Sequence, residues 1–175
     1  PNLYLIPTFA IDGTLKLYSE TKLSDEPFII QDLVHSMNND FDHIILDLSP
    51  GLGRLERSAL IASDEVISPM TPEVFGLDGL EIFIEELSKL RKNLRSNLIH
   101  KRIIINSFDN RIKQHRDIFT AATEGKFTVY KIPVDPHFRK AQEAGMAPQL
   151  FKIRGRGLKP ATAEAFEMLN QDIWS

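Results

Sequence analysis

Short apolar runs alternate along the chain with longer stretches in which apolar residues recur at helical spacing. Runs of Val, Ile and Leu bounded by loop residues are typical of buried strands, and apolar residues three or four positions apart are typical of amphipathic helices. Strands are predicted at residues 3–7, 43–48, 65–70, 102–107 and 128–132. Helices are predicted at residues 27–38, 55–62, 77–94, 110–122 and 159–173. This alternation predicts an α/β fold with a doubly wound, mostly parallel sheet and helices on both faces.

Length and composition limit the fold and its chemistry. With 175 residues, of which 42% are hydrophobic, the chain can bury one sizeable core, and a single domain over residues 1–175 is predicted. The absence of cysteine excludes disulfide bonds, thiolate zinc sites and thiol nucleophiles, and it agrees with a reducing, cytoplasmic environment. No apolar run approaches the roughly 18 to 20 residues of a membrane span. No membrane partner is therefore predicted.

Charge is distributed unevenly along the chain. The formal net charge is -3, but residues 1–99 carry 8 Lys or Arg against 16 Asp or Glu, whereas residues 100–175 carry 13 against 8. Residues 144–163 contain no acidic residue at all. A basic half on an acidic chain indicates a polyanionic partner, and the alternative for each single cation is an ordinary solvated surface.

The most informative segment is FDHIILDLSPGLG at residues 41–53, in which an apolar run ends in Asp47. In a nucleotide-binding sheet, a buried strand delivers one carboxylate in this way to the phosphate edge, where it can hold a magnesium-bound water. The alternative for Asp47 taken alone is a helix-capping or turn residue. The residues that follow it favour the first of these two interpretations.

Segments 41–53, 58–66 and 69–80 together resemble the ParA/MinD family of deviant P-loop ATPases. The first is similar to the strand and switch II pattern (F/Y)-D-x-I-I-I-D-x-P-P-x-L-G, with Ser49 in place of the first proline of the usual pair. The second, SALIASDEV, resembles N-A-L-x-A-A-D-x-V, and the third, PMTPEVFGLDGL, resembles P-x-x-x-E-x-x-A-L-x-G-L. The similarity extends over essentially the whole chain from Asn2 onwards. Several matches in order are more specific than any one motif.

The resemblance implies roles for individual residues. Asp47 would help to organise Mg²⁺, through water, and the attacking water. Asn106 stands where this family presents a residue to adenine, and an amide offers a base both a donor and an acceptor; the alternative is a strand-end Asn bonded to local backbone. Residues 132–141 resemble I-P-R-N-x-x-x-x-E-A, a loop that backs the adenine. Its candidate contacts are Pro133, Val134 and Asp135, with Val134 replacing the usual arginine and Lys140 the usual acid.

The chain lacks the phosphate-binding motif of the family. No run of the form K-G-G-x-G-K-[ST] or G-x-x-x-x-G-K-[ST] occurs in the sequence, and in this family that loop lies upstream of the matching region. The chain is therefore interpreted as the C-terminal part of a ParA-like ATPase domain. ATP hydrolysis, with ATP and Mg²⁺ as cofactors, is predicted for the parent protein and not for this chain alone.

The family also implies partners and a cellular role. The expected protein is a nucleoid-associated partition ATPase that forms an ATP-dependent homodimer, responds to a ParB-like stimulating protein and binds DNA non-specifically through surface cations. Phosphate contacts need charge and no base-reading side chain. The candidate DNA-binding residues are Arg111, Lys113, Arg139, Lys152, Arg154 and Arg156. Two alternatives stay open: a related ATPase that positions a protein cargo, and a regulatory module that has lost nucleotide hydrolysis.

Overall fold

The computed structural model describes residues 3–7, 14–23, 25–94, 97–125, 127–153 and 155–174. The chain divides into two compact units. The first unit comprises Pro1–Asp64 and Glu86–Leu98, and the second comprises Glu65–Glu85 and Ile99–Ser175. The division falls within helix α4 (Val74–Leu94), which contributes its first part to the second unit and its last part to the first.

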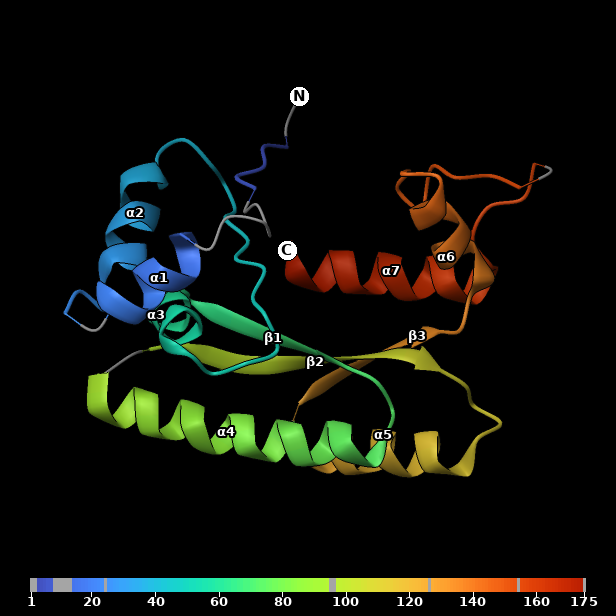
Figure 1. Ribbon diagram of the computed structural model, residues 1–175. Helices are drawn as coiled ribbons and strands as arrows, with labels where there is room; N and C mark the ends of the chain where they lie inside the picture. Colours follow the sequence, from blue (N-terminus) through green and yellow to red (C-terminus); the bar gives the residue numbers. More distant parts are fainter. Residues whose placement is uncertain are drawn as a thin grey trace. The chain divides into compact units, whose positions relative to one another are not determined.

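The second unit is built on a parallel three-stranded sheet (Figure 1). The strands lie in the order β1-β2-β3, and β2 pairs in parallel with both neighbours. Parallel neighbours need a crossover connection, which is usually a helix. Helix α4 leads from β1 to β2, and helix α5 leads from β2 to β3. The bounds are β1 (Glu65–Met70), β2 (Ile99–Phe108), α5 (Lys113–Glu124), β3 (Thr128–Pro133), α6 (Pro136–Glu143) and α7 (Pro160–Ile173).

The core of the second unit lies between the sheet and helices α4 and α5. Ile103 and Ile105 of β2 are fully buried there. They pack with Leu80 of α4 and with Ile118 and Ala122 of α5. Since successive side chains of a strand point to opposite faces, Arg102 and Ile104 face the other side of the sheet, which α7 covers (Figure 1).

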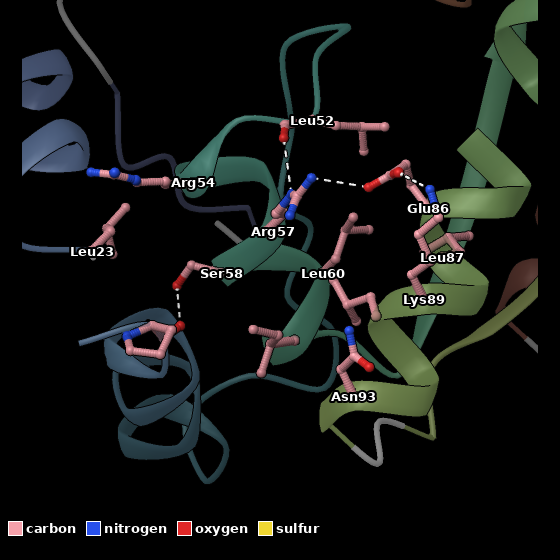
Figure 2. A pocket seen from close by; sticks show the side chains of 13 residues that line it. Leu23, Leu52, Arg54, Arg57, Ser58, Leu60, Glu86, Leu87, Lys89 and Asn93 are labelled. Carbon is pink, nitrogen blue, oxygen red and sulfur yellow. Dashed lines mark hydrogen bonds and ion pairs between the residues drawn. The ribbon is translucent and has the colours of Figure 1, made fainter. Parts of the chain in front are cut away.

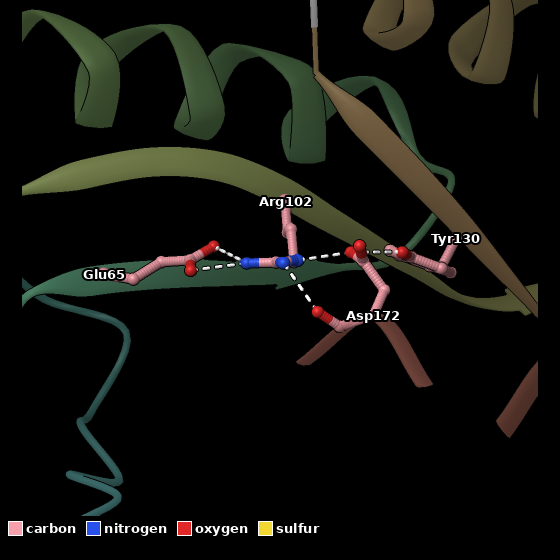
Figure 3. A network of polar contacts seen from close by, with 4 residues as sticks. All are labelled: Glu65, Arg102, Tyr130 and Asp172. Carbon is pink, nitrogen blue, oxygen red and sulfur yellow. Dashed lines mark hydrogen bonds and ion pairs between the residues drawn. The ribbon is translucent and has the colours of Figure 1, made fainter. Parts of the chain in front are cut away.

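A polar network joins α7 to the sheet (Figure 3). Arg102 of β2, 9% exposed, donates from Nε to the carboxylate of Asp172 at 2.5 Å and from Nη2 to its main-chain carbonyl at 2.7 Å. The Nη1 atom of Arg102 bonds to the carboxylate of Glu65, and the Tyr130 hydroxyl donates to Asp172 at 2.5 Å. The hydrogen bonds from Arg102 and Tyr130 lower the pKa of Asp172 to about 2. The network thus links β1, β2 and β3 to the last turn of α7.

The described helices of the first unit are α1 (Thr14–Thr21), α2 (Ile29–Met37), α3 (Arg54–Ala62) and the last turns of α4. Helix α3 lies against α2, and the buried hydroxyl of Ser58 donates to the Pro27 carbonyl at 2.7 Å. No helix in the described part of the chain is both long and apolar enough to cross a membrane.

A pocket of about 350 Å³ lies within the first unit, between α3 and the end of α4 (Figure 2). Its wall is apolar and includes Leu60 and Leu87, and its rim carries charged side chains. Arg57 donates from Nε to the Leu52 carbonyl at 3.1 Å and pairs with Glu86 at 2.9 Å. Of the residues predicted to contact nucleotide or DNA, none that the structure describes lines this pocket.

The predicted fold class is confirmed: the sheet is parallel and helices cover both of its faces. Strands β1, β2 and β3 and helices α2, α3, α4, α5 and α7 lie where the sequence predicts them, with ends that differ by up to three residues. Helices α1 and α6 were not predicted. The prediction of one domain over residues 1–175 stays a prediction.

The predicted strands at residues 3–7 and 43–48 are wrong in this structure. Both segments are irregular, and among the described residues no strand pairs with either of them. Leu3 is 86% exposed and Ile45 74%, whereas Ile44, Leu46 and Leu48 are half-buried. An apolar, β-branched run becomes a strand only where another strand completes its hydrogen bonds, and the described part of the chain supplies no such partner to either segment.

Candidate functional site

The carboxyl ends of β1, β2 and β3 meet at one edge of the sheet, because the three strands are parallel. In open α/β sheets, ligands bind beyond this edge, on the loops that leave the strands. Asn106, Pro133, Val134 and Asp135 all lie at the ends of β2 and β3 or directly after them. The structure therefore brings the four predicted adenine contacts to one edge of the second unit.

Asn106 lies at an irregularity of the sheet. The pairing of β2 with β3 shifts register between Ile105 and Phe108, and Ser107 has a positive φ of 57°. The exposed side chain of Asn106 accepts a hydrogen bond through Oδ1 from the Ser107 backbone N–H at 2.9 Å. This local bond is the alternative that the sequence left open for Asn106. The contact with adenine stays a prediction.

The end of β3 is joined to the end of β2. The backbone N–H of Val134 donates to the Phe108 carbonyl at 3.2 Å. Pro133 is half-buried and the side chain of Val134 is 50% exposed, so the two residues offer an apolar surface at the sheet edge. Such a surface can pack against the face of a purine ring.

Asp135 is buried, with 7% of its surface exposed; it is the N-cap of α6 and also bonds to the residue before α7. Its Oδ1 accepts from the His137 backbone N–H of α6 at 3.0 Å, and its Oδ2 accepts from the Lys159 backbone N–H, before α7, at 2.8 Å. Burial by itself raises the pKa of Asp135, but these backbone donors outweigh it and leave the pKa below its ordinary value. The geometry makes Asp135 a helix cap, and its predicted contact with adenine would have to use a carboxylate that is already engaged.

Asp47 lies in the first unit, on the irregular segment before α3, and is exposed. The loop after it is attached to α3: Ser49 donates to Glu56, and Arg57 holds the Leu52 carbonyl. Among the described residues, no group of three or more His, Asp or Glu side chains could hold a metal ion together. A single carboxylate fits a Mg²⁺ ion that takes its other ligands from phosphates and water.

The predicted DNA-binding cations differ in their surroundings. Arg111 pairs with Asp109 at 2.6 Å and Arg139 with Glu143 at 3.0 Å. The hydrogen bonds from Arg111 hold the pKa of Asp109 well below its ordinary range. Lys113 has a longer contact, 3.9 Å, with the carboxylate of Asp117. These three cations therefore carry neighbouring anions that reduce their attraction for a polyanion.

Lys152 and Arg156 lie in the acid-free segment, residues 144–159, which connects α6 to α7. Both are exposed, and in the part of the chain that the structure describes neither side chain forms an ion pair with an acid. Arg154, the remaining predicted DNA contact, lies outside the described residues. The described cations without an anionic partner thus include two of the predicted contacts, and both lie between α6 and α7.

Sequence reasoning missed the residues that form hydrogen bonds with Asp135. His137 was not predicted to have a role, and Lys159 was grouped with the basic residues of the acid-free stretch without a prediction of its bonds to Asp135 and Val134. A signal was present, because Asp135 followed by Pro136 is typical of a helix start with proline at the first helical position. The start of α6 was therefore predictable, whereas the contact from Asp135 to Lys159, 24 residues away, was not.

Comparison with known proteins gives a family. A family model described as an AAA domain (AAA_31) matches residues 2–100. An uncharacterised protein of Borreliella burgdorferi is 31% identical over 142 residues, which are 81% of this chain and 57% of that protein. The chromosome partitioning protein ParA of Myxococcus xanthus is 26% identical over 148 residues, 83% of this chain and 52% of ParA. The chain thus spans about half the length of these curated relatives.

Solved structures share the fold. The McdA–ATP complex of Cyanothece covers 92% of this chain and 62% of its own with a TM-score of 0.76 at 14% identity. A plasmid partition protein from Borrelia burgdorferi covers 96% and 60%, with a TM-score of 0.59 at 23% identity. Cobyrinic acid a,c-diamide synthase of Mycobacterium smegmatis with bound ADP and magnesium covers 66% and 49%, with a TM-score of 0.57 at 22% identity. With a family model that matches more than half of it and ParA among its relatives, the chain belongs to the ParA/MinD family of ATPases.

Proposed function

We propose that the protein is a ParA-like ATPase that binds ATP and non-specific DNA in order to partition plasmid or chromosomal DNA. The observation that carries the DNA part is a pair of exposed cations, Lys152 and Arg156, in a segment that has no acid; among the described residues neither forms an ion pair with an acid. Among the relatives, a chromosome partitioning protein and a plasmid partition protein support the cellular role. Bound to DNA, the protein would be associated with the nucleoid.

The nucleotide part of the proposal rests on the sheet edge. Pro133 and Val134 would support the face of adenine, and Asn106 would supply an amide to its edge. Asp47 would hold a water of the magnesium ion, and ATP with magnesium would supply the phosphoryl group and the charge that neutralises it. ADP with magnesium and ATP in the two neighbours support nucleotide binding in this fold. Hydrolysis needs a phosphate-binding loop that the sequence does not contain.

An ATP-dependent homodimer and a ParB-like partner that stimulates hydrolysis complete the proposal. Both rest on the family, since the described residues include no partner surface that identifies them. Loss of the dimer would leave DNA binding weaker, because two copies joined on one duplex bind with the higher effective concentration of a bivalent ligand.

The proposal is tested by DNA binding at several salt concentrations. Fluorescein-labelled duplexes of two unrelated sequences are titrated with the protein at about 50 to 200 mM salt, the range over which phosphate contacts weaken strongly. We expect equal affinity for the two sequences. Replacing both Lys152 and Arg156 by Ala removes two phosphate contacts, and the slope of log K against log salt falls by about 2, at 0.9 per contact.

The control is Lys92→Ala, which removes an exposed cation of α4 and leaves the slope unchanged. A protein that binds neither duplex, or binds both with no salt dependence, would not be a DNA partition ATPase. The positioning of a protein cargo, or a regulatory role without nucleotide hydrolysis, would then explain the same fold better.

A further inference from the structure

The acid-free segment between α6 and α7 is attached at its far end and contains a tight turn in its middle. At the far end, the Lys159 backbone N–H donates to Asp135, and the Lys159 Nζ donates to the Val134 carbonyl at 3.0 Å. The turn joins Ile153 and Arg156, whose backbones exchange hydrogen bonds of 2.8 and 2.9 Å. Gly155 within this turn has a φ of +76°, a conformation that glycine adopts without strain.

His137 is the side chain that holds this turn. Its Nε2 lies 2.8 Å from the main-chain carbonyl oxygen of Arg156. A carbonyl oxygen only accepts, so Nε2 carries the proton and donates it. The imidazole also contacts the ring of Phe151 with 6.0 Å between ring centroids, and 15% of the side chain is exposed. One residue of α6 therefore fixes the segment through a hydrogen bond at one position and a ring contact at another.

The position of His137 is itself fixed. Its backbone N–H bonds to Asp135, the N-cap of α6, and its Nδ1 lies 3.8 Å from the same carboxylate. The imidazole is therefore held by the helix start on one side and by Phe151 on the other. A two-residue antiparallel bridge is not stable by itself in water. The turn that carries Arg156 depends on contacts from outside the segment, and His137 provides one.

A fixed backbone in this turn would strengthen the binding of a polyanion such as DNA. A long, flexible side chain loses rotamer freedom when it binds phosphate, and a mobile backbone beneath it adds a further entropic cost. Preorganised backbone removes that second cost. Lys152 directly precedes the turn and Arg156 is its last residue, so a fixed turn presents both cations together to neighbouring phosphates.

We propose that His137 is a positioning residue of the DNA-contacting surface: through its hydrogen bond to the Arg156 carbonyl, it holds the turn that presents Arg156 and Lys152 to the phosphates. The inference rests on the proposed DNA binding and specifies how its surface is built. His137 makes no contact with DNA in this account and acts through Arg156.

Two variants separate the hydrogen bond from the ring contact. His137→Phe keeps an aromatic ring against Phe151 and loses the donor, whereas His137→Gln loses the ring and keeps an N–H donor. Affinity for a fluorescein-labelled duplex is measured for both, at salt concentrations of about 50 to 200 mM. We expect the Phe variant to weaken binding and to lower the salt slope by about 1, as Arg156→Ala does, and the Gln variant to bind within about twofold of the unmodified protein.

The double variant His137→Phe with Arg156→Ala tests whether the two residues act together. If His137 acts by holding this turn, the double variant loses less affinity than the sum of the two single losses, because coupled changes are not additive. The matched control is His35→Phe, which replaces an exposed histidine of α2 and leaves the affinity and the slope unchanged. Far-ultraviolet circular dichroism confirms that each variant is folded.

The outcomes distinguish the two proposals. If the unmodified protein does not bind the duplex, the proposed function fails and this inference fails with it. If the protein binds and Arg156→Ala weakens binding, but His137→Phe has the affinity of the unmodified protein, the positioning role is wrong and the proposed function stands. Additive losses in the double variant also overturn the inference, because they would mean that His137 acts independently of Arg156.

Discussion

Replacing Arg102 by Met tests whether the polar network of Figure 3 holds α7 on the sheet. Methionine has nearly the length of the arginine stem, so the change removes the charge and the donors with little loss of volume. Arg102 is buried and donates to the carboxylates of Glu65 and Asp172 and to the main-chain carbonyl of Asp172. All of these acceptors lose their cationic partner at once.

The expected loss of stability follows from the burial of the three side chains. Breaking a fully buried ion pair by removing one partner costs about 3 to 5 kcal/mol. Here the arginine side chain is 11% exposed, but those of Glu65 and Asp172 are 31% and 35% exposed and can recover part of their hydration. We therefore expect a loss of about 2 to 3 kcal/mol. For a chain of this length, that lowers the Tm by roughly 5 to 10 °C.

The assay combines thermal unfolding with amide hydrogen exchange. We expect faster exchange in α7, while α5, which packs on the opposite face of the sheet, keeps its protection. Arg139→Met is the matched control, because it makes the same chemical change in an exposed pair, with side chains 87% and 61% exposed, and costs about 0.5 kcal/mol or less. If Arg102→Met is no more destabilising than this control, or if α7 exchanges as before, the network does not hold α7.

Three further predictions follow from burial and pairing. The hydrogen bond from Arg102 lowers the pKa of Asp172 to about 2, below its ordinary value, so ionised Asp172 stabilises the fold above about pH 4 and this contribution is lost as the pH falls toward 2. Thermal unfolding across this range should show that the stability of Asp172→Asn falls less with decreasing pH than that of the unmodified protein. Ile118→Ala removes a core side chain that is 4% exposed and should cost about 3 kcal/mol in urea unfolding, whereas Ile112→Ala, 44% exposed, should cost less than about 1. The amides of residues 43–48 should exchange near the rate of an unfolded chain and those of β2 much more slowly, and equal protection would mean that 43–48 is paired as a strand.

Periodicity predicted the second unit well because its elements are amphipathic and pack on one another. The helical spacing of apolar residues located α4 to within three residues of its observed start. β2 begins three residues earlier than predicted, because Ile99 and His100 pair with β1. That extension depends on the partner strand, and a local pattern contains no information about a partner.

The same limit explains the error at residues 43–48. The run is apolar and β-branched in its middle, which is what a buried strand needs, but the described residues supply no strand beside it. The prediction missed helix α6 for a different reason: the helix is short and polar, and only Ala141 of its side chains is buried. Its start was marked by Asp135 and Pro136, and the helix itself had too weak an apolar pattern to be recognised.

The charges of the second unit show what a sequence count leaves out. The excess of cations over acids in residues 100–175 counts Arg102 and Arg139 equally with Lys152 and Arg156. In the structure, the first two face acidic partners, so their fields are largely cancelled within the protein, whereas the last two have no acid beside them in the described part of the chain. Since phosphate binding depends on the local field and not on the sum, the surface proposed for DNA is smaller than the excess of charge suggests. It is centred on the turn that His137 holds.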